Sequence, residues 1–101
     1  DIVEAWTDPG IADVRIRRDL LKYARTKIDK PNLVRATNRL AEFSGDVLVL
    51  WSRNRVMPVA HAEALTQLTG GTLRYVDDAK VLIMLDQPEE TARAIGEFLR
   101  R

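Results

Sequence analysis

One stretch, Asp46 to Pro58, constrains the fold of this chain more than any other. Within it, five apolar residues in succession, Val47 to Trp51, run directly into the short polar segment Ser52 to Val56. Such a run, rich in β-branched and aromatic residues, is typical of a strand that is covered on both faces, as in a parallel sheet flanked by helices. Because chemistry in these sheets collects just past the carboxyl ends of the strands, we expect functional residues at Ser52 to Val56.

Length and composition exclude several classes of protein. The 101 residues allow one domain at most, and a content of 46% hydrophobic and 31% charged residues is ordinary for a folded chain. The net charge of +1 argues against nucleic acid as a partner. No apolar run approaches the roughly 20 residues that span a bilayer, so we expect no membrane partner. The absence of cysteine fits a reducing compartment, and we expect the cytoplasm.

The first 44 residues predict helices. Residues 1–9 are expected to be a lead-in anchored by Trp6, with Asp8-Pro9 as the start signal of a helix. That helix is amphipathic, and its apolar stripe consists of Ile16, Leu20, Tyr23, Ala24 and Ile28. We interpret its basic residues as a solvated face, with a phosphate or acidic-partner surface as the alternative. A second helix is expected over 32–43, with Leu33, Thr37, Leu40 and Ala41 on its inner side.

The remaining residues predict helix and strand in alternation. Pro58 begins a helix with Ala62, Leu65 and Leu68 inside, and Gly70-Gly71 ends it. Thr72 to Val76 is expected to be a second strand, followed by a turn over 77–80 and by the apolar run Val81 to Leu85, whose conformation the pattern leaves open. The last helix follows Asp86-Gln87-Pro88, and its expected buried stripe is Thr91, Ile95, Phe98 and Leu99.

The fold class that these elements predict is α/β, in the order helix, helix, strand, helix, strand, helix, with parallel strands. Two parallel strands are too few to stand alone, since the pair buries little surface and leaves unpaired edges. We expect the sheet to be completed by an upstream part of the same protein, by a second chain or by an exchanged copy, so that a homo-oligomer is one alternative. The chain begins at Asp1 without methionine, which is consistent with an excised piece of a longer protein.

From Asp46 to Arg101 the chain resembles the C-terminal portion of α/β-hydrolase-fold proteins. The resemblance lies in Val47-Leu48-Val49-Leu50-Trp51, in Arg55-Val56-Met57-Pro58 before a helix that carries His61 and Leu65, and in Asp86-Gln87-Pro88 before Ile95-Gly96-Glu97-Phe98-Leu99. Residues 1–44 resemble the end of the helical cap that many of these hydrolases carry. The resemblance implies two parts, with 1–44 as the end of the cap and connecting helices and 45–101 as the strand-helix-strand-helix portion of the hydrolase core.

The same resemblance implies where catalytic residues would lie, and no competent residue is found there. The family's acid position falls on Asn54, or on Arg55 if the shorter turn is aligned differently, and its histidine position falls on Val81. No Gly-x-Ser-x-Gly nucleophile elbow occurs, and neither Ser44 nor Ser52 is a credible nucleophile. We therefore name no catalytic residue. An amide cannot stabilise the imidazolium of a working triad, and valine cannot transfer a proton.

Other chemistries find little support in the sequence. The single histidine, His61, is interpreted as a partly exposed structural residue, with catalysis as the less favoured alternative. One histidine without cysteine argues against a transition-metal site, and Asp77-Asp78 fits a turn better than a cation site. Gly70-Gly71 lacks the rest of a phosphate loop, so no cofactor is expected.

Two functions are carried forward from the sequence. The first is the C-terminal part of a hydrolase of ester, epoxide or similar small apolar substrates, inactive alone and, as a whole molecule, either a degenerate binder of a small apolar ligand or an enzyme whose acid and base come from elsewhere. The second is a non-catalytic interaction module that assembles through its sheet edge and its apolar run.

Overall fold

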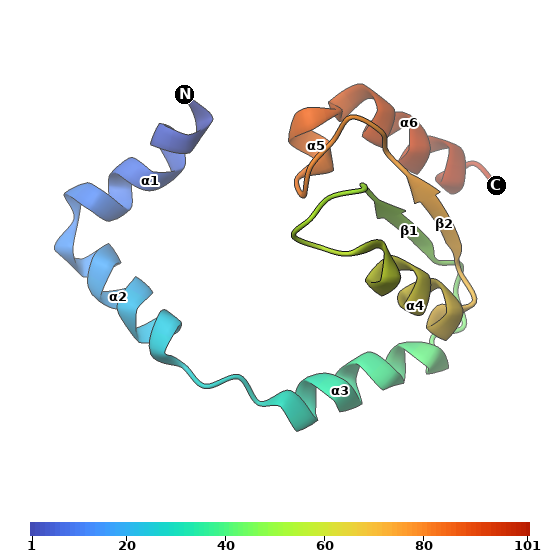
Figure 1. Ribbon diagram of the computed structural model, residues 1–101, viewed down its shortest axis with the longest axis horizontal. Coiled ribbons are helices and arrows are strands. Elements are labelled where there is room, and N and C mark those ends of the chain that lie inside the picture. Colours follow the sequence, from blue (N-terminus) through green and yellow to red (C-terminus); the bar gives the residue numbers. More distant parts are fainter. The chain divides into compact units, whose positions relative to one another are not determined.

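A computed structural model describes all 101 residues, which form two compact units, Asp1–Pro31 and Asn32–Arg101. The first unit is entirely helical, and the second contains a two-stranded sheet with its helices (Figure 1). The predicted mixture of helices with an incomplete parallel sheet is therefore confirmed. The interpretation of 1–44 as cap and 45–101 as core stays a prediction.

The first unit consists of helices α1 (Ile2–Ala12) and α2 (Val14–Arg25). The expected lead-in over residues 1–9 is wrong, because Asp1 and Glu4 form a capping box that starts α1 at once. Pro9 lies inside α1 and does not begin a helix. The second helix begins instead at Asp13, whose carboxylate accepts a hydrogen bond from the backbone N–H of Arg15 at 2.9 Å.

Neither α1 nor α2 contains a buried residue. The apolar stripe predicted for α2 is present, but the helix ends at Arg25, so Ile28 lies beyond it. Trp6, Ile16 and Leu20 are all exposed and line a surface hollow of about 700 Å³ within this unit. The apolar faces of the two helices are thus left without a core of their own.

The second unit places one helical layer on each face of the sheet (Figure 1). Its elements are α3 (Lys30–Asn38), the 3₁₀-helix η1 (Arg39–Glu42), β1 (Leu48–Trp51), α4 (Val59–Thr69), β2 (Thr72–Tyr75), α5 (Ile83–Asp86) and α6 (Pro88–Leu99). The apolar run after Val81, left open by the sequence, becomes the short helix α5. The helix predicted over 32–43 is divided into α3 and η1, and no residue of its predicted inner side is buried. Leu33 is exposed, whereas Thr37 and Leu40 line grooves together with residues of β1 and α4.

Strands β1 and β2 pair in parallel over four residue pairs, from Leu48 opposite Thr72 to Trp51 opposite Tyr75. Val49 and Leu65 of α4 line one common groove, whereas Leu48 and Phe98 of α6 line a pocket on the other face. Successive side chains of a strand point to opposite faces, so β1 must be apolar throughout to serve both helices. This is the reason for its uninterrupted apolar sequence.

The buried core is small and consists of Val49, Ala62, Val76, Ile83 and Ala94. The stripe predicted for α6 is only partly right. Thr91 is buried and Phe98 half-buried, but Ile95 and Leu99 are exposed, the latter at 74% of its surface. The buried face instead follows Thr91, Ala94 and Phe98, at i, i+3 and i+7, and the small side chain of Ala94 lets the helix approach the sheet. No helix is long and apolar enough to cross a membrane.

The connection from α4 into β2 depends on two glycines with different tasks. Gly70 ends α4 in the left-handed conformation, with φ of 65°, as the sequence predicts. Gly71 lies against β1, so that a Cβ there would come within 2.7 Å of the backbone oxygen of Val47. That oxygen accepts the hydrogen bond from the Thr72 N–H at 2.9 Å, the first bond between the two strands.

We expect Gly71→Ala to lower the free energy of unfolding by about 1–3 kcal/mol, because backbone atoms cannot make room for the added carbon. Gly96→Ala is the matched control: its Cβ would meet the flexible end of Arg100, and alanine in a helix interior is favoured over glycine by about 0.5–1 kcal/mol. Urea unfolding of both variants gives the comparison. Equal effects of the two substitutions would contradict the close approach at Gly71.

Candidate functional site

The candidate site lies at the carboxyl ends of the two parallel strands. The loop 52–58 leaves β1 there, and the segment 76–82 leaves β2 beside it. In an open parallel sheet, functional loops meet at the carboxyl ends of the strands. This site also carries the two positions that the sequence singled out, Asn54 and Val81.

Asn54 is half-buried and uses both atoms of its side-chain amide within its own loop. Its Nδ2 donates to the backbone oxygen of Ser52 at 3.1 Å and to the Ser52 hydroxyl at 3.0 Å. Its Oδ1 accepts from the backbone N–H groups of Val56 at 2.9 Å and of Met57 at 2.7 Å. Asn54 therefore holds the shape of the turn, as asparagine side chains commonly do. Arg55, the alternative position, is exposed.

Ser52 connects the two loops. It is only 2% exposed, and its hydroxyl donates to the backbone oxygen of Lys80, the residue before Val81. A chain of two hydrogen bonds thus runs from the Asn54 amide through the Ser52 hydroxyl to the second loop. The sequence indicated Ser52 only as a small residue after the strand, because its partner lies 28 positions away.

Two side chains at the junction of α5 and α6, Asp86 and Gln87, hold the second loop in place. The carboxylate of Asp86 accepts from the backbone N–H of Lys80 at 2.7 Å, and the Gln87 amide donates to the backbone oxygen of Asp78 at 3.1 Å. Asp78 itself has a φ of 54°, which aspartate tolerates better than most residues and which confirms the predicted turn. Val81 follows this fastened turn and is half-buried.

Arg53 closes the exposed side of the two loops. Its guanidinium lies 3.9 Å from the centre of the Tyr75 ring and 3.1 Å from a carboxylate oxygen of Asp77. Both ionic side chains are mostly exposed, so the pair itself contributes little to stability. The stacking still joins the end of β2 to the loop that follows β1.

The hydrogen bond of Ser52 to Lys80 thus joins the two loops that carry Asn54 and Val81, and neither of these side chains is a proton-transferring group. Every hydrogen-bonding atom of Asn54 is already engaged in the loop, and Val81 has none. No group of three or more His, Cys, Asp or Glu side chains is placed to hold a metal ion.

His61 lies on the first turns of α4 and is exposed. It lines an apolar groove of about 550 Å³ together with Trp51 and Leu68, and a neighbouring groove of about 380 Å³ lies along Val47, Val49 and residues of η1 and α4. Both volumes are in the range of small-molecule sites, roughly 300–1,000 Å³. His61 makes none of the hydrogen bonds that organise the loops.

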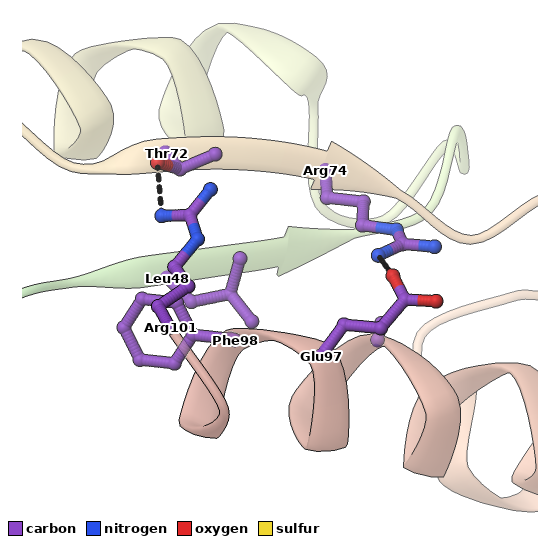
Figure 2. A pocket seen from close by; sticks show the side chains of 7 residues that line it. Leu48, Thr72, Arg74, Glu97, Phe98 and Arg101 are labelled. Atoms are coloured by element: carbon purple, nitrogen blue, oxygen red, sulfur yellow. Dashed lines mark hydrogen bonds and ion pairs between the residues drawn. The ribbon is translucent and has the colours of Figure 1, made fainter.

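The opposite face of the sheet carries a pocket of about 160 Å³ whose lining includes the ion-paired side chains of Arg74 and Glu97 (Figure 2). Arg74 of β2 points toward α6 and contacts the carboxylates of Glu97 at 2.6 Å and Glu90 at 3.5 Å. Arg93 completes the network by pairing with both glutamates. The pocket is smaller than a ligand site of roughly 300 Å³, so we assign it to the attachment of β2 to α6.

Comparison of the chain with protein-family models, curated proteins and solved structures finds no match. The interpretation of the site therefore depends on the residues and their geometry.

Asn54→Ala is expected to lower the free energy of unfolding by about 2 kcal/mol, because the Val56 and Met57 amides and the Ser52 hydroxyl lose their partner. Arg55→Ala, at the next position and exposed, should change it by less than about 0.5 kcal/mol. Denaturant unfolding of the two variants measures the difference. Indistinguishable stabilities would refute the structural role of Asn54.

Acid should weaken the attachment of β2 to α6. The hydrogen bond from Arg74, followed by that from Arg93, holds the pKa of Glu97 below its ordinary value of 4.5. A carboxyl whose pKa is depressed by folding contributes stability above its unfolded value, and this stability is lost as the pH falls through the folded value. We expect Glu97→Gln to be less stable than the wild type at neutral pH, with the difference shrinking below pH 4.5.

Thermal unfolding across this pH range provides the measurement. Glu63→Gln is the control, because Glu63 is exposed on α4 and lies outside the ion-pair network. A difference between Glu97→Gln and the wild type that stays constant with pH would show that the network does not stabilise the fold.

Proposed function

We propose that the chain is the closing portion of an α/β-hydrolase-fold protein that acts on, or binds, an ester, epoxide or similar small apolar compound. The observation that carries the proposal is the hydrogen-bonded junction of the two loops, in which Ser52 joins the Asn54 turn to the segment before Val81. In the family that the sequence resembles, these positions supply the acid and the histidine. The geometry supports their pairing, although their chemistry is lost.

This portion alone is proposed to be inactive. An acyl-transfer site needs a nucleophile, a base and an acid that orients the base. Asn54 and Val81 replace the last two, and the chain has no nucleophile elbow. Activity in a larger protein would require an upstream nucleophile and proton-transferring residues from elsewhere. Without them the molecule would be a binder of small apolar ligands, for which the grooves beside Trp51 and Val49 are large enough.

The incomplete sheet supports a larger body around this portion. Many large apolar side chains are exposed, among them Trp6, Phe43 and Leu99. An upstream part of the same protein or a second chain is the proposed cover. The cytoplasm is the proposed compartment, in keeping with the absence of cysteine.

The proximity of the two loops can be tested by introducing an imidazole at Val81 and a carboxylate at Asn54. In Val81→His the new imidazole should titrate at a pKa that is higher by about 1 when Asn54→Asp is added, because a nearby carboxylate favours the imidazolium. Asn38→Asp in the same Val81→His background is the control, since it adds the same charge at the end of α3. NMR titration of the imidazole protons gives both values.

An equal pKa in the single variant and in the Asn54→Asp double variant would overturn the proposed pairing of the loops. A rise as large with Asn38→Asp would show a general charge effect and would overturn it too.

A further inference from the structure

Helix α2 is apolar on one side and strongly basic on the rest of its surface. Five of its twelve residues are basic and only one is acidic, so the helix as a whole is positively charged. Successive residues of a helix are rotated by about 100°, which places Arg18 and Arg25 opposite the stripe that contains Ile16 and Leu20. A charged helix of this kind, with low net hydrophobicity and one apolar side, is typical of helices that lie on a membrane surface.

The apolar side of α2 continues onto α1. Trp6 of α1 and Leu20 of α2 line the same hollow of about 700 Å³, and Trp6 is 64% exposed. Glu4 and Asp8 are each two positions away from Trp6, so they are rotated by about 200° from it and lie on the far side of α1. The two helices thus share one broad apolar surface from which the acidic residues of α1 are turned away.

The charge and the width of this surface together indicate what covers it. An upstream segment that packs on the stripe accounts for the apolar residues but gives the basic residues no counterpart. An acidic groove on another protein takes up a single helix and would leave the apolar residues of the other helix uncovered. The surface of an anionic bilayer is continuous, so it covers both helices, and its headgroups attract the long basic side chains, which reach them from the sides of an embedded helix. Tryptophan, present here as Trp6, is enriched at the boundary between headgroups and acyl chains.

We propose that the first unit binds the surface of an anionic bilayer through the apolar side that Trp6 and Leu20 share, with the basic residues of α2 among the headgroups. The expectation of no membrane partner rests on the length of the apolar runs, which bears on helices that span a bilayer and not on helices that lie in its interface. The proposal does not depend on the hydrolase proposal. The polypeptide proposed to complete the sheet concerns the second unit, to which both strands belong.

Co-sedimentation of the 101-residue chain with lipid vesicles tests the proposal on the wild type. We expect binding to vesicles of phosphatidylcholine mixed with phosphatidylserine, and binding at least about tenfold weaker to phosphatidylcholine alone, because each basic residue near an anionic surface strengthens binding about fivefold. Added salt should weaken the binding to the anionic vesicles, since it screens exposed charges.

The contribution of charge is measured with Lys22→Gln combined with Arg25→Gln. Glutamine keeps the helix propensity while two charges are lost, so binding to the anionic vesicles should weaken about 25-fold. Arg55→Gln combined with Arg100→Gln is the matched control, because it removes the same charge from exposed positions of the second unit. Its effect should stay below about twofold, since charges distant from the lipid are screened.

The contribution of the apolar side is measured with Leu20→Gln. Leu20 is 60% exposed, so the substitution removes apolar area that the lipid would bury, and binding should weaken about tenfold. Leu99→Gln is the matched control, because Leu99 is an exposed leucine of α6 in the second unit and should leave binding unchanged.

Equal binding to the two kinds of vesicle, or no binding to the anionic ones, would overturn the proposal, and this comparison on the wild type holds even where a variant fails to fold. A loss as large in the control variants would show an effect of general charge or hydrophobicity and would overturn it too. Binding of polyglutamate without binding to vesicles would assign the basic residues to an acidic protein, against the proposal. None of these outcomes affects the imidazole titration of the hydrolase proposal, so the two proposals are separately refutable.

Discussion

The parallel pairing of β1 with β2 is the contact on which the second unit depends. It is only four residue pairs long. It nevertheless sets the register of the two strands, so that β1 and β2 begin side by side after Val47 and Gly71 and end side by side before Ser52 and Val76. Helix α4 and helix α6 then have a common surface to cover from opposite sides. Without the pairing, neither the loop junction nor the ion-pair network at Arg74 would have its partner in reach.

The fold is ordered, but it buries little of its apolar surface. Its buried core consists of a few small or medium side chains, whereas many large apolar residues of both units remain exposed. A chain of this size buries only about 65% of its surface even in a well-packed domain, so lost burial cannot be made up elsewhere in the molecule. Covering these side chains with further polypeptide or with a bilayer surface, as we propose, would add buried area against the conformational entropy lost on folding.

Much of the second unit could be predicted from the sequence because its signals are local. The apolar run of β1, the Pro58 and Gly70 boundaries of α4 and Pro88 at the start of α6 all act on their immediate neighbours. The start of α1 at Asp1 was missed because Asp8-Pro9 is a stronger pattern than a capping box at the chain end. The exposure of Ile95 and Leu99 could not be predicted, since periodicity gives the apolar positions of a helix but not the rotation that packing selects.

The candidate site, like the fold, could be predicted from the sequence only in part. Asn54 and Val81 are the positions that the resemblance to α/β-hydrolase-fold proteins indicates, and they lie in the loops that follow β1 and β2. The hydrogen bonds that connect the two loops could not be predicted. Ser52 bonds to Lys80 and Lys80 bonds to Asp86, and these residues come close together only in the folded chain. Sequence spacing gives positions along a chain, whereas these bonds depend on where two loops meet in space.

The turn around Asn54 has a consequence for the electrostatics of this position. Two backbone N–H groups converge on Oδ1, at 2.9 and 2.7 Å, and such donors stabilise negative charge as readily as they bind a neutral amide oxygen. The turn therefore has the polarity of an anion-binding cradle while it holds an uncharged group. A carboxylate placed at this position would meet two backbone donors that the folded loop already directs at it.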